Sequence, residues 1–122
     1  MSTRKENAVT YDTVRRAAAR FPGVEEGTSY GAPALKVRGK LLARLREDGT
    51  TLVLKCESID REMLMQAAPD VFFVTDHYRD YPLVLIDLSK LSRKALPGLL
   101  EDAWRRLASR RQLAEHEGKG GA

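Results

Sequence analysis

Residues 75–82, with the sequence TDHYRDYP, hold the densest group of side chains that could do chemistry. Tyrosine, histidine and arginine side chains can stack on a nucleobase or another flat ring. A histidine beside two aspartates could also act as a proton acceptor or as one metal ligand. A structural role stays open as well, in which the tyrosine rings cover a sheet edge with their apolar area.

A second group of candidate residues is cationic and lies between residues 34 and 56, where apolar and polar residues alternate. A period of two predicts strands with one apolar and one polar face. The apolar face would contain Leu35, Val37, Leu41, Ala43, Leu45, Leu52 and Leu54. The other face would contain Lys36, Arg38, Arg44, Arg46 and Lys55 together with Leu42, Thr51 and Val53, with Lys40 at a turn.

This predicted face has five cations and no carboxylate. Such a face suits the phosphates of a nucleic acid, because lysine and arginine contacts displace condensed counterions. The alternative is an ordinary polar face of an antiparallel sheet whose other face packs on helices.

The groups that catalysis and metal binding need are otherwise missing from the sequence. There is no glycine-rich phosphate loop, no nucleophile elbow and no zinc-ligand spacing. Cys56 falls on the apolar side of its strand, where a thiol is inert, and His116 is the only histidine besides His77. We therefore expect no catalytic residues, no metal and no cofactor, in a protein that is not an enzyme.

The composition bounds the class of protein. The chain has 122 residues, 43% of them apolar, which suffices for one domain with a two-layer core. No apolar run approaches the roughly 18 residues of a membrane span, and no secretory signal is visible. A single cysteine fits a reducing compartment. We expect a cytoplasmic monomer that does not contact membranes.

The formal net charge of +4 is unevenly distributed. Residues 1–20 and 105–122 each contain five cations and two carboxylates, and the central part is slightly acidic. Basic ends of this kind are typical of proteins that bind polyanions, although an arginine-rich helix is also an ordinary solvated surface.

Periodicity and turn residues predict eight elements. They are a helix at 11–21 with Thr10 as N-cap, strands at 34–38, 41–46 and 51–56, a helix at 60–67 capped by Ser58 or Asp60 and closed by Pro69, strands at 71–74 and 83–88, and a helix at 92–112. Residues 24–33 are expected to be a turn-rich connection with one short extended piece, and the strand at 83–88 is expected to be central.

These elements predict a two-layer α+β domain over residues 10–113, in the order α-β-β-β-α-β-β-α. Tight hairpins impose antiparallel pairing, and the amphipathic helices need one sheet face to cover. Residues 1–9 and 114–122 are polar or glycine-rich, and we expect both ends to be disordered.

Several segments resemble the MmcQ/YjbR family. They are FPGVEEGTSYGAPA at 21–34, KVRGK at 36–40, TDHY at 75–78, YP at 81–82 and AW at 103–104. The resemblance covers residues 10–112 and implies an α+β fold with helices on an antiparallel sheet, related to frataxin-like and secretion-chaperone-like arrangements. Members are usually described as double-wing, DNA-binding-like domains. Leu35 stands where members often carry an aromatic residue, which argues against stacking at that position.

Two functions follow as hypotheses. The first is non-enzymatic DNA binding through phosphates, without a readable sequence preference, by Lys36, Arg38, Lys40, Arg44, Arg46, Lys55, Tyr78, Arg79 and Tyr81. The alternative is a module that binds a protein or a small ligand between the loops at 27–33 and 77–82. Its pocket would contain Ser29, Tyr30, His77 and Tyr78.

Overall fold

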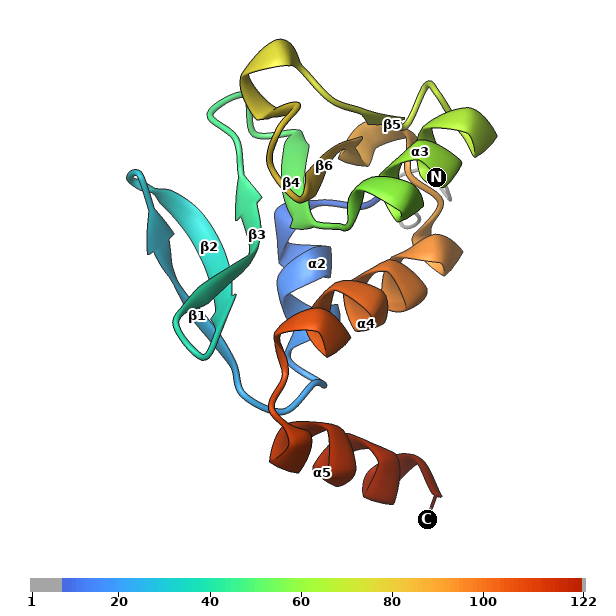
Figure 1. Cartoon of the computed structure of the whole chain (residues 1–122). Coiled ribbons are helices and arrows are strands. Elements are labelled where there is room, and N and C mark those ends of the chain that lie inside the picture. The colour runs from blue at the N-terminus through green and yellow to red at the C-terminus, as the bar shows by residue number, and fades with distance from the viewer. Residues whose placement is uncertain (1–7, 122) are drawn as a thin grey trace, which may run out of the picture.

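Six antiparallel strands form one sheet at the centre of the structure (Figure 1). The computed structural model describes residues 8–121, with side chains for residues 8–118. The strands are β1 (Val24–Ser29), β2 (Ala32–Val37), β3 (Lys40–Leu45), β4 (Thr51–Lys55), β5 (Phe72–Phe73) and β6 (Leu83–Asp87). Their order is β1-β2-β3-β4-β6-β5, so β6 lies inside the sheet, between β4 and β5.

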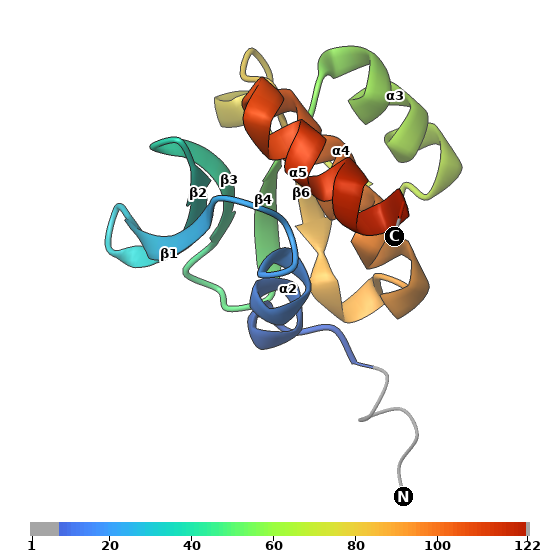
Figure 2. The same cartoon turned by 90° about the horizontal axis from the view of Figure 1, so that it is seen from below.

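Helices pack against one face of this sheet, which we call the inner face (Figures 1 and 2). They are α2 (Tyr11–Ala18), α3 (Ser58–Ala67) and α4 (Leu96–Leu107). Helix α5 (Arg110–Gly121) follows α4 and lies beyond it, away from the sheet, at the bottom of Figure 1. The 3₁₀ turns are η1 (Asp76–Tyr78), η2 (Leu88–Lys90) and η3 (Arg93–Ala95). Helix α4 contacts α2, β3 and β4, and α3 contacts β5 and β6. The predicted two-layer α+β class is confirmed.

The core runs across the inner face in rows of paired residues. Leu35 of β2, Ala43 of β3, Leu54 of β4 and Val84 of β6 occupy successive register positions, and all four are buried. Because the helices above contribute further apolar side chains, the sheet and helices share one continuous core.

A bulge between β2 and β3 changes which face two leucines occupy. Leu35 pairs with Ala43, but Lys36 pairs with Leu41, so Leu42 is the extra residue. Leu41 therefore faces outward beside Lys36, and Leu42 is fully buried in the core. Strict alternation predicts the reverse placement of these leucines, which is wrong because a bulge interrupts the period of two.

The segment at 24–33 is more regular than the sequence indicates. It forms all of β1, a two-residue turn at Tyr30 and Gly31, and the start of β2. Pro33 lies beyond the last pair between β2 and β3, at a strand end where proline is tolerated. The glycine and proline residues of this segment belong to the β1–β2 hairpin at the edge of the sheet. This hairpin precedes the β2–β3 hairpin, which the sequence predicts to be the first.

The C-terminal part consists of two helices where the sequence predicts one. The backbone of Ala108 is extended, and α5 begins after Ser109. Ser109 and Gln112 cap this start reciprocally: each backbone N–H donates to the other residue's side chain. Residues 114–121, expected to be disordered, are helical instead, and residue 122 lies outside the described part of the chain.

The N-terminal expectations are met in part. Thr10 is the N-cap of α2, as predicted, and its hydroxyl accepts from the backbone of Thr13. Val9 is buried in the core rather than disordered, while residues 1–7 lie outside the described residues. Helix α3 starts at Ser58 with Glu57 at its N-cap and no side-chain cap, so neither predicted cap for this helix is present.

Trp104 of α4 joins this helix to the segment that follows α2. Its indole N–H donates to the buried carbonyl oxygen of Pro22 at 2.8 Å. The indole centroid lies 5.3 Å from that of Phe21 and 5.0 Å from the ring of His116 on α5. Trp104 therefore holds α2, α4 and α5 together.

Within residues 8–121, every helix is too short or too polar to span a lipid bilayer.

We expect Trp104→Phe to lower the free energy of unfolding by about 2–4 kcal/mol. The substitution removes the donor to Pro22 and leaves a cavity beside Phe21. Urea denaturation monitored by circular dichroism measures the change in the free energy of unfolding. Tyr81→Phe, which alters an exposed ring, is the control and should unfold at the wild-type urea concentration. A loss below 1 kcal/mol for Trp104→Phe would contradict this account.

Candidate functional site

The outer face of the sheet carries a hollow of about 370 Å³ lined by aromatic side chains. The β1–β2 turn supplies one side of it, and the chain from η1 to β6 supplies another; both segments lie toward the top of Figure 1. Its lining residues are Tyr30, Leu41, His77, Tyr78, Tyr81 and Leu83.

An adjoining depression of about 250 Å³ shares Leu41, Tyr81 and Leu83 with the hollow. It extends the hollow along the outer face toward Lys40 and Lys55. We call the two depressions together the aromatic groove. Of the predicted ligand-pocket residues, Tyr30, His77 and Tyr78 line it, and Ser29 does not.

Arg61 of α3 fixes the side of the groove that contains Tyr78 and Tyr81. Its guanidinium donates to the carbonyl oxygens of Arg79, Tyr81 and Leu83 at 2.9, 3.1 and 3.0 Å. Arg61 is 6% exposed, and its Nε has no hydrogen-bond partner among the described residues. A buried guanidinium stays charged, and three carbonyl dipoles offset part of the cost of its burial.

Tyr78 is held by contacts from β3. The guanidinium of Arg44 donates to the hydroxyl of Tyr78 at 2.6 Å, and that of Arg46 lies over the Tyr78 ring, 5.9 Å from its centroid. The ring of His77 meets the Tyr78 ring edge to face at 4.8 Å. Because these contacts restrict Tyr78 from several sides, its ring is a preformed wall of the groove.

Tyr30 is the opposite case: the guanidinium of Arg44 lies 5.7 Å from the centroid of its ring, and the ring is otherwise open to solvent. The residue is 97% exposed and has a φ of 53°, and Gly31 after it also has a positive φ. Two successive positive φ angles are the geometry of a type I′ hairpin turn. A non-glycine residue in this conformation costs about 1–2 kcal/mol, and its exposed ring returns no packing energy.

Arg38 and Gly39 form a second turn of this kind, between β2 and β3. Arg38 has a φ of 55°, and its guanidinium donates to the carbonyl oxygen of Leu107 at 3.3 Å. Arg38 thus points along the end of α4 rather than into the middle of the predicted cationic face.

The other predicted cations divide into paired and unpaired groups. Lys55 pairs with Glu57 at 3.4 Å, and Arg79 pairs with Asp76 at 2.8 Å. No ion pair within the described residues involves the remaining four, which are Lys36, Lys40, Arg44 and Arg46.

The outer face is neither fully open nor free of acids, in contrast to the prediction from alternation. Val53 and Leu85 pair with each other on this face, and both are buried. Strand β1 places Glu25 opposite Lys36, and Asp87 is opposite Thr51. The cationic character is therefore concentrated around the aromatic groove.

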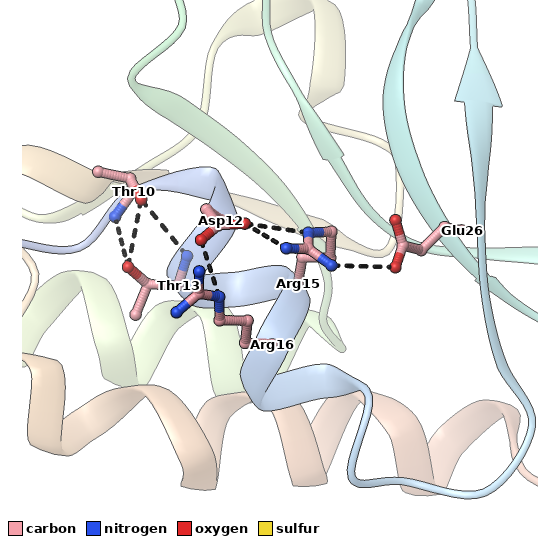
Figure 3. Close-up of polar contacts among 6 residues, drawn as sticks. All are labelled: Thr10, Asp12, Thr13, Arg15, Arg16 and Glu26. Atoms are coloured by element: carbon pink, nitrogen blue, oxygen red, sulfur yellow. Dashed lines mark hydrogen bonds and ion pairs between the residues drawn. The ribbon is translucent and has the colours of Figure 1, made fainter.

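Two arginines of α2 form ion pairs within the helix (Figure 3). Asp12 pairs with Arg15 and with Arg16, the latter at 2.9 Å. The hydrogen bond from Arg15 lowers the pKa of Asp12, and Arg15 also reaches Glu26 of β1 at 3.3 Å. Arg15 thereby ties α2 to the sheet.

The arginines of α4 are paired in the same way. Arg105 pairs with Glu101 at 2.8 Å and with Glu117 at 3.5 Å, and Arg106 pairs with Asp60 of α3 at 2.8 Å. Arg105 and Arg106 are therefore balanced locally by carboxylates, whereas Arg110 and Arg111 of α5 form no ion pair within the described residues.

Cys56 is a buried thiol on the inner side of the sheet. Desolvation raises its pKa to about 11, so the thiolate is scarce at neutral pH.

Within the described residues, no three histidine, cysteine, aspartate or glutamate side chains are placed to hold a metal ion.

We expect native Cys56 to react with iodoacetamide at pH 8 about 100-fold more slowly than in the urea-unfolded chain. A pKa about two units above its ordinary value leaves about 1% of the usual thiolate. Mass spectrometry measures both rates, and equal rates would show that the thiol is accessible and ionised.

We expect Arg61→Met to lower the free energy of unfolding by about 2–4 kcal/mol and to loosen the groove. Three partly buried carbonyl oxygens lose their charged donor, so the amides of Tyr81 and Leu83 should exchange hydrogen faster. Hydrogen exchange with mass spectrometry reports this change. Gln66→Met, on an exposed side of the same helix, should leave exchange at residues 79–83 unaltered. Unaltered exchange in Arg61→Met as well would reject the positioning role.

Comparison with known proteins agrees with this architecture. The crystal structure of a Deinococcus radiodurans protein with a DUF419 domain superposes with a TM-score of 0.71 at 20% sequence identity, covering 90% of this chain and 89% of that one. No curated protein matches the chain. The model of the YjbR family matches residues 19–106, from the end of α2 almost to the end of α4. The chain belongs to the YjbR family.

Proposed function

We propose that this chain is a non-enzymatic DNA-binding protein that holds phosphates with the arginines beside its aromatic groove. The observation that carries this proposal is the placement of Arg44 and Arg46. Both guanidinium groups contact Tyr78 of the groove, and neither forms an ion pair among the described residues. The pKa of the Asp48 carboxyl is lowered chiefly by the hydrogen bond from Thr51, although Arg46 is near enough to help lower it. The resemblance to double-wing, DNA-binding-like domains points the same way.

Unpaired cations beside rings suit a nucleic acid for two reasons. Phosphate oxygens supply the negative charge that the guanidinium groups lack, and binding them releases condensed counterions. Lys36 lies on the outer face opposite Leu41, and Lys40, at the start of β3, lines the adjoining depression. Phosphate contacts position a strand without selecting its sequence, so the proposal includes no sequence preference.

The other predicted contacts take secondary places. Lys55 and Arg79 already have carboxylate partners and would have to exchange them for phosphate. Arg38 lies at a turn at one end of the groove, with its guanidinium on the Leu107 carbonyl. Tyr81 and Tyr78 contribute ring surface to the groove.

A second candidate function is a pocket for a protein segment or a small ligand. The observation that favours it is that Tyr30, His77 and Tyr78, three of the four residues named for this alternative, line one hollow. Binding of this kind would depend little on salt, whereas DNA binding weakens steeply as salt rises.

We expect the double variant Arg44→Ala/Arg46→Ala to bind DNA more weakly and with a shallower salt dependence. Each lost phosphate contact should reduce the slope of log K against log salt by about 0.9 for duplex DNA or about 0.7 for a single strand. Fluorescence anisotropy with labelled random oligonucleotides, at several salt concentrations, measures both quantities.

Arg16→Ala/Arg105→Ala is the matched control, since it removes the same charge from arginines that are already paired. Its slope of log K against log salt should stay within about 0.3 of the wild-type slope, which is less than half of the contribution of one phosphate contact. If both double variants have the same slope of log K against log salt, binding depends on the net charge of the protein and not on the arginines beside the groove. Arg44→Lys/Arg46→Lys retains the charge and should retain most of the slope.

A further inference from the structure

We propose that the aromatic groove takes an unpaired base of single-stranded DNA, stacked against Tyr30 or Tyr81. This inference rests on the proposed function and specifies its substrate as a single strand rather than a duplex. Three observations carry it: the exposure of Tyr30, the ring surfaces of the hollow and the position of Arg44.

The backbone conformation and the exposure of Tyr30 are both unfavourable, and the packing of the fold explains neither of them. Its φ of 53° is unfavourable for a tyrosine, and at 97% exposure the ring adds nothing to the core. Asparagine or glycine would satisfy the same turn with less strain. A strained residue that presents a large ring beside a hollow indicates a binding role.

The hollow offers aromatic surface over a small volume. Tyr30, Tyr78, Tyr81 and His77 all line it, and the exposed fraction of Tyr81 is 56%. Its volume of about 370 Å³ is at the low end of the range for ligand pockets, which suits one base better than an extended ligand. In a duplex the faces of the bases are covered by their neighbours, so a wall of rings can stack only on an unpaired base.

Arg44 connects the ring surfaces to the charge. Its guanidinium lies 5.7 Å from the centre of the Tyr30 ring and donates to the hydroxyl of Tyr78. A base in the hollow would bring its phosphate to the same border, where Arg44 and Arg46 have no carboxylate partner among the described residues. A neutral apolar peptide segment would fill the hollow but would leave the guanidinium groups of Arg44 and Arg46 without a negative partner. A nucleic acid strand supplies both a ring and a phosphate.

The test compares wild type and Tyr30→Asn in anisotropy titrations with a labelled oligothymidine and with a duplex of equal length. Asparagine suits the turn, so the variant should keep or raise the wild-type melting temperature. We expect it to lose about 5- to 150-fold in affinity for the single strand, the value of one stacked base. Its salt slope and its duplex affinity should equal those of the wild type.

Two further variants sharpen the comparison. Tyr30→Phe retains the ring and should bind the single strand like the wild type. Ile59→Asn removes a side chain of α3 that is 75% exposed and does not line the groove, and it should also have no effect. A loss in Ile59→Asn equal to that in Tyr30→Asn would overturn the inference.

The outcomes separate this inference from the proposed function. Salt-dependent binding that is equally tight for duplex and single strand, or that Tyr30→Asn does not weaken, overturns the stacking site and leaves the DNA-binding proposal standing. If thymidine monophosphate binds as tightly as the oligonucleotide, the claim that the groove binds a DNA strand is wrong, and the ligand is a free nucleotide. No salt-dependent binding to either oligonucleotide overturns both proposals.

Discussion

The guanidinium of Arg61 is the contact on which the outer face depends. One buried side chain donates to three carbonyl oxygens between Arg79 and Leu83, and so it couples α3 to the start of β6. Without this donor the partly buried carbonyl oxygens would lose charge-assisted hydrogen bonds, so conformations of this segment that break them are unfavourable. The loop that carries Tyr78 and Tyr81 is therefore ordered before any ligand arrives, which reduces the entropy that binding must remove.

Ion pairing sorts the arginines of this basic chain into two roles. On α2 and α4 the arginines lie three or four residues from a carboxylate, or face one on a neighbouring element, and they link secondary structure. Arg44 and Arg46 have tyrosine partners instead, and a ring or hydroxyl does not cancel a positive charge. Arg44 and Arg46 therefore add positive charge beside the groove, whereas Arg20, Arg110 and Arg111, which also form no ion pair within the described residues, add it near the two ends of the chain.

The two type I′ turns show how local strain and exposure combine at the ends of β2. Both use a large side chain, Tyr30 or Arg38, where a smaller residue would fit the positive φ better. The strain is tolerable because each hairpin is anchored by paired strands. The turns thereby present a ring at one end of the outer face and a guanidinium near its other end, both outside the core.

Local signals were sufficient for most of the elements. Thr10 caps α2, and Asp48 accepts hydrogen bonds from Thr51 in the predicted β3–β4 turn, because caps and turns depend on residues a few positions apart. The burial of Leu42, the carbonyl contacts of Arg61 and the docking of His116 on Trp104 depend on segments far apart in the chain. Local periodicity carries no information about such contacts, because they arise only when sheet register and helix packing bring distant residues within hydrogen-bond or van der Waals distance. The types of side chain available for binding could thus be named from the sequence, whereas their arrangement around one groove required the folded chain.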